Sequence, residues 1–462
     1  MKKLLLRVLI IVIVISMFIS LSLAGCKVKE TPEEIATSET TAAETTITET
    51  TEAATKTPAE EKELSVLSYS QFVPAGEDYL KKVVDEWGAA NGVKVKIDFV
   101  AANDMPSKIT SEISVGSGHD ITAIESYLSY IYEKGLADVG KYMDEVIAQS
   151  GEVSDLGKKI SIVNGTWRSI PWYHQSTVIV YRKDLTKEVG YPVEKMNSLT
   201  LDDLMDLTKK LYEKGKGVVG FPVSSCGDAN AIMASILWEF GGTLFDKNNK
   251  VAVYSPETKA ALEYVAELGK YMPAEVTGWD NSGNNVFMLS GKGALSANPP
   301  SIYASAKKDN LEFASEIYHA PFPSGPGGSY RFTGVFSFGI VEHSKNKDLA
   351  AELIKYLLQK DIFMGHIDAS QGYTAPLYAD LTNVSTYWSD NPALSAIEPA
   401  KETLVPIGWP GPEATPTAAS ARVQLNYILP IMFSKVLSGD STPEEAMTWT
   451  EGELNRFVLE GK

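Results

Sequence analysis

Apolar and polar positions between residues 64 and 125 follow strand and helix periods in turn. Leu64–Tyr69 is a short apolar run, and Val93–Phe99 alternates apolar with polar residues, which predicts a strand at each place. Asp120–Glu125 predicts a third strand. Between these strands, Glu77–Asn91 places its apolar residues on one helical face, and Pro106–Val115 also predicts a helix. This β-α-β-α-β order predicts a doubly wound sheet with helices on both faces.

A second series of elements begins near Trp172 and predicts a second α/β lobe. Thr200 begins a capping-box pattern ahead of a helix that runs to about Lys214. Ser255 is expected to cap a further helix, with Pro256 in its first turn. No repeat of fixed period is visible, which excludes a solenoid. The other predicted elements are strands over Val178–Tyr181 and Gly334–Val341 and helices over Asp228–Phe240 and Lys347–Gln359.

The N-terminal residues have the pattern of an export signal. Basic residues near the start precede Val8–Leu23, an almost uninterrupted apolar run. That run is short for a bilayer span of roughly 20 residues but suits the core of a signal peptide. It ends in Leu-Ala-Gly-Cys at residues 23–26, which resembles the bacterial lipobox. The resemblance implies cleavage of residues 1–25 and acyl chains such as palmitate on Cys26. A plain transmembrane anchor with an incidental cysteine is the alternative.

The segment that follows Cys26 predicts a spacer. Residues 27–63 are rich in threonine and glutamate and contain no aromatic residue, so burial cannot offset the entropy cost of ordering them. A coil of this length spans roughly 35 Å. We therefore expect residues 26–63 to be a lipidated cysteine followed by a disordered linker, with O-glycosylation of the threonines as an open alternative.

Composition and charge exclude several classes of protein. The 462 residues are 44% hydrophobic and 22% charged, which is normal for a soluble globular chain. The net charge of −17 argues against nucleic acid as a partner, because such binding needs clustered positive charge. Two cysteines cannot build a disulfide framework, and five dispersed histidines do not predict a metal site.

Motifs for catalysis are missing from the sequence. Neither a Gly-x-Ser-x-Gly elbow nor a His-Glu-x-x-His pair occurs. Gly291-Lys292-Gly293 lacks the context of a phosphate loop and predicts a helix-to-strand turn. Asp246–Lys250 begins like a calcium loop, but the lysine replaces an oxygen ligand, so a hairpin turn is expected. Cys226 is interpreted as a small buried residue. We therefore expect no catalytic residue, no metal and no cofactor.

Tryptophans lie in loops beside proline or glycine, at Trp172, Trp279 and Trp409. Sugar rings present apolar faces that stack on aromatic side chains, and their hydroxyl groups bind carboxylates and amides. Trp87, on the apolar face of a predicted helix, is expected to be a core residue instead. The loop tryptophans therefore suggest a carbohydrate cleft, with simple packing beneath a loop as the alternative.

Several motifs occur in an order that resembles a known family. Gly118-His119-Asp120-Ile121 is similar to that family's glycine-proline-aspartate ahead of the third strand, with His119 in place of proline. Tyr181–Leu185 is similar to its tyrosine-asparagine-lysine-aspartate-leucine, and Phe287–Ala297 to its phenylalanine–x–x–glycine–lysine–alanine–methionine segment. Over Leu64–Lys462 the chain thus resembles the bacterial extracellular solute-binding proteins of family 1, the sugar-capturing, maltose-binding-protein-like subunits of ABC importers.

The resemblance implies a type II periplasmic-binding-protein fold. Such a fold has two lobes, each a doubly wound sheet flanked by helices, which are joined by a multi-strand hinge and close on a ligand. The crossings are expected near Ile170–Tyr173, Tyr318–Phe322 and Gln371–Leu377. One lobe would then comprise 64–171 plus 323–370, and the other 172–321 plus 372–462.

The same geometry predicts which residues line the cleft. They follow strand ends, begin helices or stand in the loops that carry tryptophan, and Asp228 has simple helix capping as its alternative role. The expected ligand-binding residues are Ser70, Gln71, Glu125, Ser126, Trp172, Asp228, Asn230, Trp279, Asn298 and Trp409.

The resemblance implies that a monomeric lipoprotein captures a mono- or oligosaccharide and delivers it to the membrane subunits of an ABC transporter. We expect it to be exported and anchored through Cys26 to the outer face of the cell membrane, or to the periplasmic or outer-membrane leaflet of a double-membrane cell. One alternative is the same fold with another solute, such as a peptide, a polyamine or a metal chelate. Another is a tethered enzyme that acts on glycans.

Overall fold

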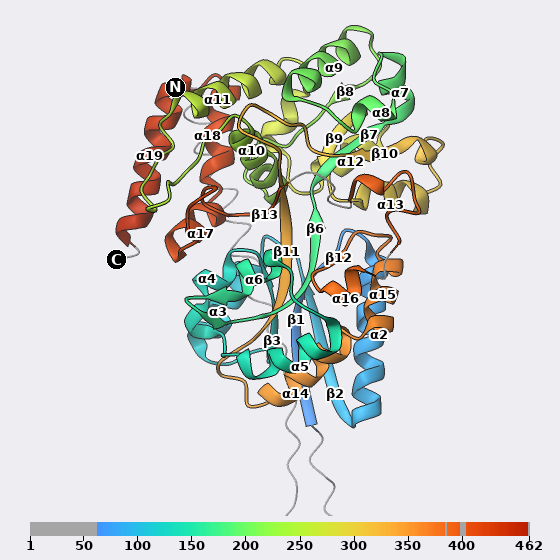
Figure 1. Cartoon of the computed structure of the whole chain (residues 1–462), viewed down its shortest axis with the longest axis vertical. Helices are drawn as coiled ribbons and strands as arrows, with labels where there is room; N and C mark the ends of the chain where they lie inside the picture. Colours follow the sequence, from blue (N-terminus) through green and yellow to red (C-terminus); the bar gives the residue numbers. More distant parts are fainter. Residues whose placement is uncertain (1–61, 384–385, 398–402, 461–462) are drawn as a thin grey trace, which may run out of the picture. The chain divides into compact units, whose positions relative to one another are not determined.

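The computed structural model describes residues 62–383, 386–397 and 403–460 (Figure 1). Contacts divide the chain between Ala59 and Glu60, and the fold below is that of the C-terminal unit. The predicted signal peptide, the lipidation of Cys26 and the spacer up to residue 61 lie outside the described residues.

The first predicted series forms one half of a large sheet. Strands β1 (Lys62–Tyr69), β2 (Val93–Val100) and β3 (Ile121–Glu125) occur at the three predicted places, and β1 pairs in parallel with both β2 and β3. Lys62 and Glu63 were expected in the disordered linker but belong to β1, because they pair with Val93 and Lys94 of β2. Helices α2 (Pro74–Asn91) and α3 (Met105–Val115) form the crossovers. The apolar face of α2, including Trp87, is buried as expected.

Longer-range strands complete the large sheet. Its order is β12-β6-β11-β3-β1-β2, with β13 beside β11. The added strands are β6 (Ile170–Ser176), β11 (Tyr330–Ile340), β12 (Ala375–Pro376) and β13 (Thr403–Pro406). Strand β11 is antiparallel to β3 and β6 and is buried along nearly its whole length, because both of its faces are covered.

A smaller sheet forms the centre of the second lobe. Its order is β10-β7-β9-β8, from β7 (Val178–Arg182), β8 (Val218–Val219), β9 (Gly293–Asn298) and β10 (Ile317–Ala320). Since β6 ends at Ser176 and β7 begins at Val178, the chain passes from one sheet to the other around Thr177. In Figure 1 β6 and β11 are the long strands between the two groups of elements.

Helices of the second lobe begin where the sequence signals predict. Thr200 forms a reciprocal capping box with Asp203 ahead of α9 (Leu201–Glu213), and the Ser255 side chain caps α11 (Pro256–Gly269). The other helices of this region are α10 (Gly227–Glu239), α12 (Gly283–Leu289) and α13 (Ser301–Lys308). Residues 290–292 form the predicted turn between α12 and β9.

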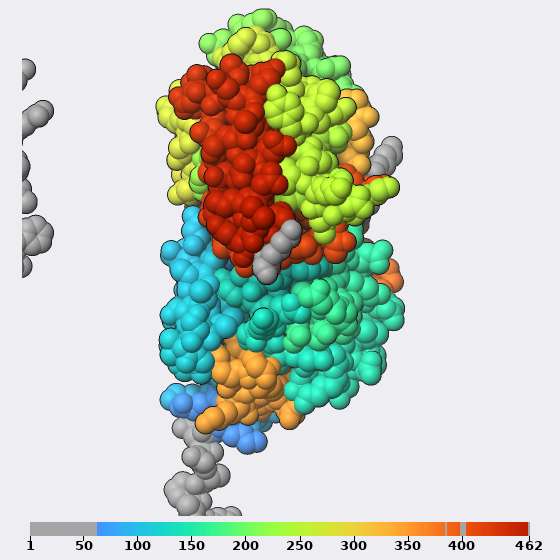
Figure 2. All heavy atoms as spheres, turned by 90° about the vertical axis from the view of Figure 1, so that its left-hand side faces the viewer, coloured from blue at the N-terminus to red at the C-terminus, as the bar shows by residue number. Residues whose placement is uncertain are grey.

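The C-terminal helices belong to the second lobe and also contact the first. Helices α17 (Ala418–Leu425), α18 (Ile428–Leu437) and α19 (Pro443–Glu460) pack against one another and against α10 or α11. Helix α17 also packs against α4 (Leu128–Ile131) of the first lobe. Figure 2 shows the C-terminal residues (red) directly against the cyan and teal residues of the first lobe.

The remaining elements surround these sheets. They are η1 (Glu133–Gly135), α5 (Gly140–Ser150), α6 (Asp155–Ser161), β4 (Ile162–Val163), β5 (Thr166–Trp167), α7 (Lys183–Glu188), α8 (Val193–Met196), η2 (Ala274–Gly278), η3 (Ala314–Glu316), α14 (Lys347–Leu357), α15 (Lys360–Ala369), α16 (Ala379–Thr382) and η4 (Ser395–Ile397).

The sheets divide the chain at slightly different places from the predicted lobes. Residues 172–176, 375–376 and 403–406 were expected in the second lobe, yet they belong to the large sheet, the last of them because β13 pairs with β11. The reason for the other two ranges is that β6 pairs with β11 as far as Ser176, and the short strand β12 pairs with β6.

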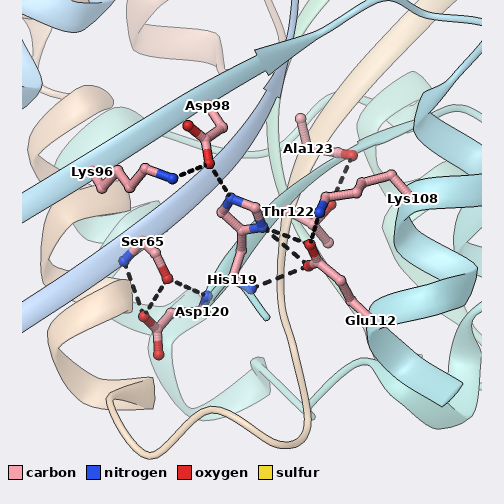
Figure 3. Close-up of polar contacts among 9 residues, drawn as sticks. All are labelled: Ser65, Lys96, Asp98, Lys108, Glu112, His119, Asp120, Thr122 and Ala123. Carbon is pink, nitrogen blue, oxygen red and sulfur yellow. Dashed lines mark hydrogen bonds and ion pairs between the residues drawn. The ribbon is translucent and has the colours of Figure 1, made fainter. Parts of the chain in front are cut away.

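An ionic cluster around the buried side chains of His119 and Glu112 holds the first crossovers together (Figure 3). His119, the residue at the position of the family's proline, is 7% exposed. Its Nδ1 lies 2.8 Å from Oε1 of Glu112 in α3, and its Nε2 lies 3.0 Å from Oδ2 of Asp98 in β2. Lysines at 96 and 108 contact the same two carboxylates. The cluster thereby ties β2, α3 and the start of β3 into one unit.

Candidate ligand-binding cleft

A cavity of about 710 Å³ lies where the two lobes meet. The first lobe contributes residues after β1, β2 and β3, the second contributes residues at the start of α10 and after α17, and β6 and β11 supply part of the lining. Its polar and aromatic lining residues include Phe72, Asn103, Ser107, Thr110, Glu125, Tyr127, Gln175, Thr177, Asp228, Asn230, Asn281, Asn298, Phe336, Tyr373 and Tyr427. The three parallel strands β1, β2 and β3 all end at this edge, which explains why loops from the first lobe converge here.

Glu125 ends β3 and enters the cavity from the first lobe. Ser126, the next residue, has a positive φ of 40° and is fully buried, and its Oγ accepts a hydrogen bond of 3.0 Å from the backbone N–H of Val335. This contact fixes the sharp turn that follows the carboxylate. Burial, together with the negative charge of Asp228, raises the pKa of Glu125 to about 7.

Asp228 enters the cavity from the second lobe, in the first turn of α10. Its Oδ2 accepts a 2.9 Å hydrogen bond from Nδ2 of Asn284. Burial raises the pKa of Asp228 to about 7, which the bond from Asn284 opposes and the charge of Asp280 reinforces. The capping alternative does not describe Asp228, because Cys226 occupies the N-cap position and no side chain caps this helix.

Amide side chains behind Asp228 form a connected network. Nδ2 of Asn298 donates to Oδ1 of Asn285 at 2.9 Å and to Oγ of Ser301 at 2.8 Å, while Nδ2 of Asn284 lies 3.2 Å from Oδ1 of Asn298. Asn298 is 3% exposed, so its amide is held in one orientation. The network positions both Asn298 and the Asp228 carboxylate at the wall of the cavity.

Asn230 has a free acceptor in the same wall. The residue is 2% exposed, and its Nδ2 donates to the backbone oxygen of Gln424 at 3.2 Å. Its Oδ1 has no hydrogen-bond donor from the described chain. A buried polar atom without a partner is uncommon in native proteins and calls for an explanation.

Aromatic rings form much of the remaining lining. Phe336 of β11 packs edge-on against Tyr69, with ring centroids 5.2 Å apart, and is thereby held against the cavity. Tyr427 has a φ of 54°, a left-handed conformation that is strained for an aromatic residue. Its hydroxyl lies 3.5 Å from Oδ1 of Asn103, so this pair bridges the two lobes.

Four of the ten predicted residues line the cavity together: Glu125, Asp228, Asn230 and Asn298. Ser126 lies immediately behind the lining, where it holds the backbone of β11. Ser70 is exposed after β1, and the Gln71 side chain turns to His366, with 3.3 Å between their Nε2 atoms. The β1–α2 loop contributes Phe72 to the lining instead.

None of the three predicted tryptophans lines the cavity, because each ring packs against other side chains. Trp172 is 2% exposed and stacks between Phe338 and His366, at centroid distances of 4.3 and 5.3 Å. Trp279 packs on Phe287 with 5.1 Å between the ring centroids. The ammonium of Lys159 lies 5.1 Å from the ring centroid of Trp409. The aromatic surface of the cavity comes from tyrosine and phenylalanine.

The sequence patterns did not predict most of the aromatic lining residues or several of the polar ones. Tyr127 lies two residues after Glu125, and Gln175 directly precedes the buried end of β6. Tyr373 and Tyr427 come from loops far along the chain. Their shared signal, polar or aromatic residues directly after an element end, is too common to single them out.

Within the described ranges, no group of three or more histidine, cysteine, aspartate or glutamate side chains is arranged to hold a metal ion. The helices in the same part of the chain include none that combines the length and apolar character needed to cross a membrane.

Comparison with known proteins relates this geometry to a family. The sequence profile described as bacterial extracellular solute-binding protein matches residues 74–362. A probable ABC transporter-binding protein of Deinococcus radiodurans is 25% identical over 406 residues, which cover 84% of this chain and 92% of that protein. An arabinooligosaccharide-binding protein of Halalkalibacterium halodurans is 23% identical over 42% of this chain and 44% of its own length.

Solved structures share the fold at lower identity. Maltose-bound MalE3 of T. maritima aligns with a TM-score of 0.73 and 20% identity over 85% of this chain and 99% of its own. A Thermotoga lettingae solute-binding protein with bound α-D-tagatose aligns with a TM-score of 0.73 and 19% identity over 86% of this chain and 100% of its own. The predicted two-lobed α/β fold is thereby confirmed. The chain belongs to the bacterial extracellular solute-binding protein family and is a solute-binding protein of an ABC transporter.

Proposed function

We propose that this protein captures a carbohydrate in the cavity between its lobes. The observation that carries the proposal is the lining itself, which combines carboxylates, amides and flat aromatic rings within about 710 Å³. Carboxylates and amides bind sugar hydroxyl groups, and aromatic rings cover the apolar faces of a pyranose. Relatives that are named for, or bound to, arabino-oligosaccharide, maltose and tagatose support the same class of solute.

Capture involves closure of the lobes around the solute. The cavity has walls from both sheets, and the chain passes between the sheets at short connections such as Thr177. At the wall of the cavity, Tyr427 of the second lobe contacts Asn103 of the first. A solute that touches both walls binds the closed state better than an open one, and so shifts the equilibrium towards closure.

The place of action follows from the N-terminal sequence. We propose that acyl chains on Cys26 hold the protein at the outer face of a membrane, and that the threonine- and glutamate-rich spacer lets the lobes reach the transporter. The solute passes unchanged to the membrane subunits of the importer, so the protein binds but does not turn over its ligand.

A thermal-shift screen tests the carbohydrate class. Mono- and oligosaccharides are compared with peptides, polyamines and metal ions on the purified protein. A sugar present at 100 times its dissociation constant stabilises the folded state by about 2.7 kcal/mol, which raises the melting temperature. A response to a non-sugar solute, with no response to any sugar, contradicts the proposal.

A further inference from the structure

The charged groups of the cavity are all of one sign. Its described lining residues include the carboxylates of Glu125 and Asp228 and contain no lysine, arginine or histidine. Of the two groups, one comes from each lobe, so any solute that fills the cavity meets a carboxylate on both sides.

The charge of Asp228 acts on Glu125, and both carboxylates act on groups around them. The charge of Asp228 adds to the effect of burial in raising the pKa of Glu125. Tyr373, which also lines the cavity, has its pKa raised by burial and then by the charges of both carboxylates. The neighbouring titratable groups that act on Glu125 and Asp228, or respond to them, are Tyr69, Tyr127, Tyr173, Tyr427, Cys226 and Asp280. None of these groups can supply a compensating positive charge.

The cavity also has acceptors that lack donors. In the described part of the chain no donor pairs with the Glu125 carboxylate, and Asp228 accepts a side-chain hydrogen bond only from Asn284. The Oδ1 of Asn230, a residue that is 2% exposed, is a third acceptor without a donor. The carboxylates of Glu125 and Asp228 are partly exposed to the cavity, and the buried Oδ1 of Asn230 is costly to leave unpaired, so the solute is expected to provide several N–H or O–H donors.

Aromatic side chains complete the environment of a cation. The rings of Tyr127, Phe336, Tyr373 and Tyr427 line the same cavity as the two carboxylates. Faces of such rings attract an ammonium group as well as covering a sugar face.

We propose that the captured carbohydrate carries a protonated amino group, and that this ammonium binds between Glu125 and Asp228. The inference rests on the proposed carbohydrate function and names its substrate class: amino sugars or their oligosaccharides. The neutral amides at Asn103, Gln175, Asn281 and Asn298 then serve the hydroxyl groups of the same molecule. A linear polyamine fits less well, since it would leave this amide-rich part of the wall without partners.

Matched glycans test the inference on the purified protein by titration calorimetry at pH 7. Glucose, glucosamine and N-acetylglucosamine, the corresponding galactose series, and their β-1,4-linked di- to tetrasaccharides differ at one substituent: hydroxyl, free amine or acetamide. We expect the free amine to bind at least tenfold more tightly than either partner in the same series.

Isosteric variants test the assignment to two residues. Glu125→Gln and Asp228→Asn keep the shape of the cavity and remove one charge each, and each is expected to reduce the preference for the amine at least tenfold. The exposed Asp309→Asn is the matched control and should leave the preference unchanged. If a cavity variant does not fold, the comparison of amine with hydroxyl on the unchanged protein still decides.

The outcomes separate the two proposals. Neutral sugars that bind as tightly as amino sugars overturn the inference and leave the carbohydrate function standing. Binding of putrescine or spermidine without binding of any glycan overturns both. Failure of every amino sugar in the series to bind, while another sugar raises the melting temperature in the thermal-shift screen, overturns the inference alone.

Discussion

Tyr427 combines two features that single it out among the aromatic residues of the cavity. It has a left-handed backbone conformation, and its hydroxyl group contacts Oδ1 of Asn103 in the other lobe. Strained residues persist where the surrounding structure fixes them, and they are concentrated at binding sites. Burial raises the pKa of its hydroxyl to about 12, so Tyr427 remains a hydrogen-bond donor at neutral pH.

Truncation of Tyr427 should therefore weaken binding. We expect Tyr427→Ala to cost about 1–3 kcal/mol of binding free energy, because it removes an aromatic wall of the cavity. Trp409→Ala is the matched control: its ring faces Lys159, so solute affinity should change by less than about threefold. Calorimetric titration of both variants measures the difference, and a larger loss for Trp409→Ala would reverse this assignment.

The raised pKa values of Glu125 and Asp228 predict a pH dependence of stability. A carboxyl group whose folded pKa exceeds its unfolded value stabilises the fold at low pH, and this contribution is lost as the pH rises through the folded value. The reference values are 4.5 and 3.8, and both folded values are about 7. The contribution should therefore disappear between about pH 4 and pH 7.

A double variant isolates that contribution. His174, His319 and His366 act in the opposite direction, because burial lowers the pKa of each to about 4. The difference in unfolding free energy between the unchanged protein and the Glu125→Gln/Asp228→Asn variant cancels the histidine effect. We expect this difference, measured by denaturant titration without solute, to fall from pH 4 to pH 7. A flat difference would show that the carboxylates are not desolvated.

At the scale of elements, sequence patterns correctly predicted the features whose positions depend on contacts between near neighbours in the chain. The helix starts at Thr200 and Ser255 and the alternation in Val93–Phe99 depend on near neighbours, and they occur in the structure as expected. The extent of β6 does not depend on near neighbours, since it is set by pairing with β11 more than 150 residues away. Local sequence patterns therefore could not predict the residue at which one lobe ends and the other begins.

For the candidate site, too, the sequence predicted those residues that depend on local patterns and not those that depend on tertiary contacts. Glu125, Asp228, Asn230 and Asn298 lie at the ends of elements whose positions the sequence predicts. Tryptophans were expected to stack on the solute, but Trp172 has both faces covered by Phe338 and His366, which are distant in sequence. Which aromatic ring is exposed in a cavity depends on such tertiary contacts.

The ionic cluster around His119 gives a prediction for the first crossovers. His119→Ala leaves the buried Glu112 carboxylate without its closest ring partner and should destabilise the fold by about 2–4 kcal/mol. Lys82→Met removes an exposed ion pair with Glu86 in the same lobe and should cost less than about 1 kcal/mol. Denaturant unfolding compares the two, and equal costs would mean that the cluster contributes no more than a surface pair.

The same cluster contributes to the pH dependence of stability on the acid side. The hydrogen bonds of Asp98 to Lys96 and His119 lower the pKa of its carboxyl group, and bonds from His119 and Lys108 lower that of Glu112 against the effect of burial. For groups with a lowered folded pKa, stability is present above the unfolded value and is lost as the pH falls through the folded value. The stability contributed by Asp98 and Glu112 is therefore lost as the pH falls, whereas that contributed by Glu125 and Asp228 is lost as the pH rises.

At the scale of the whole molecule, the proposed lipid anchor and spacer would hold the two lobes near the transporter that receives the solute. The fold and the family are those of a solute-binding protein, and the cavity between the two sheets is where the proposed carbohydrate binds. Its walls come from residues 72 to 427 and meet only in the folded unit. Closure is the step that joins capture to delivery.

A crystal structure with the glycan that gives the largest thermal shift tests the central claim most directly. We expect a sugar ring inside the cavity, within hydrogen-bond distance of both Glu125 and Asp228 and in contact with the Tyr427 ring. A glycan bound elsewhere on the molecule, or bound in the cavity without touching either carboxylate, would contradict it.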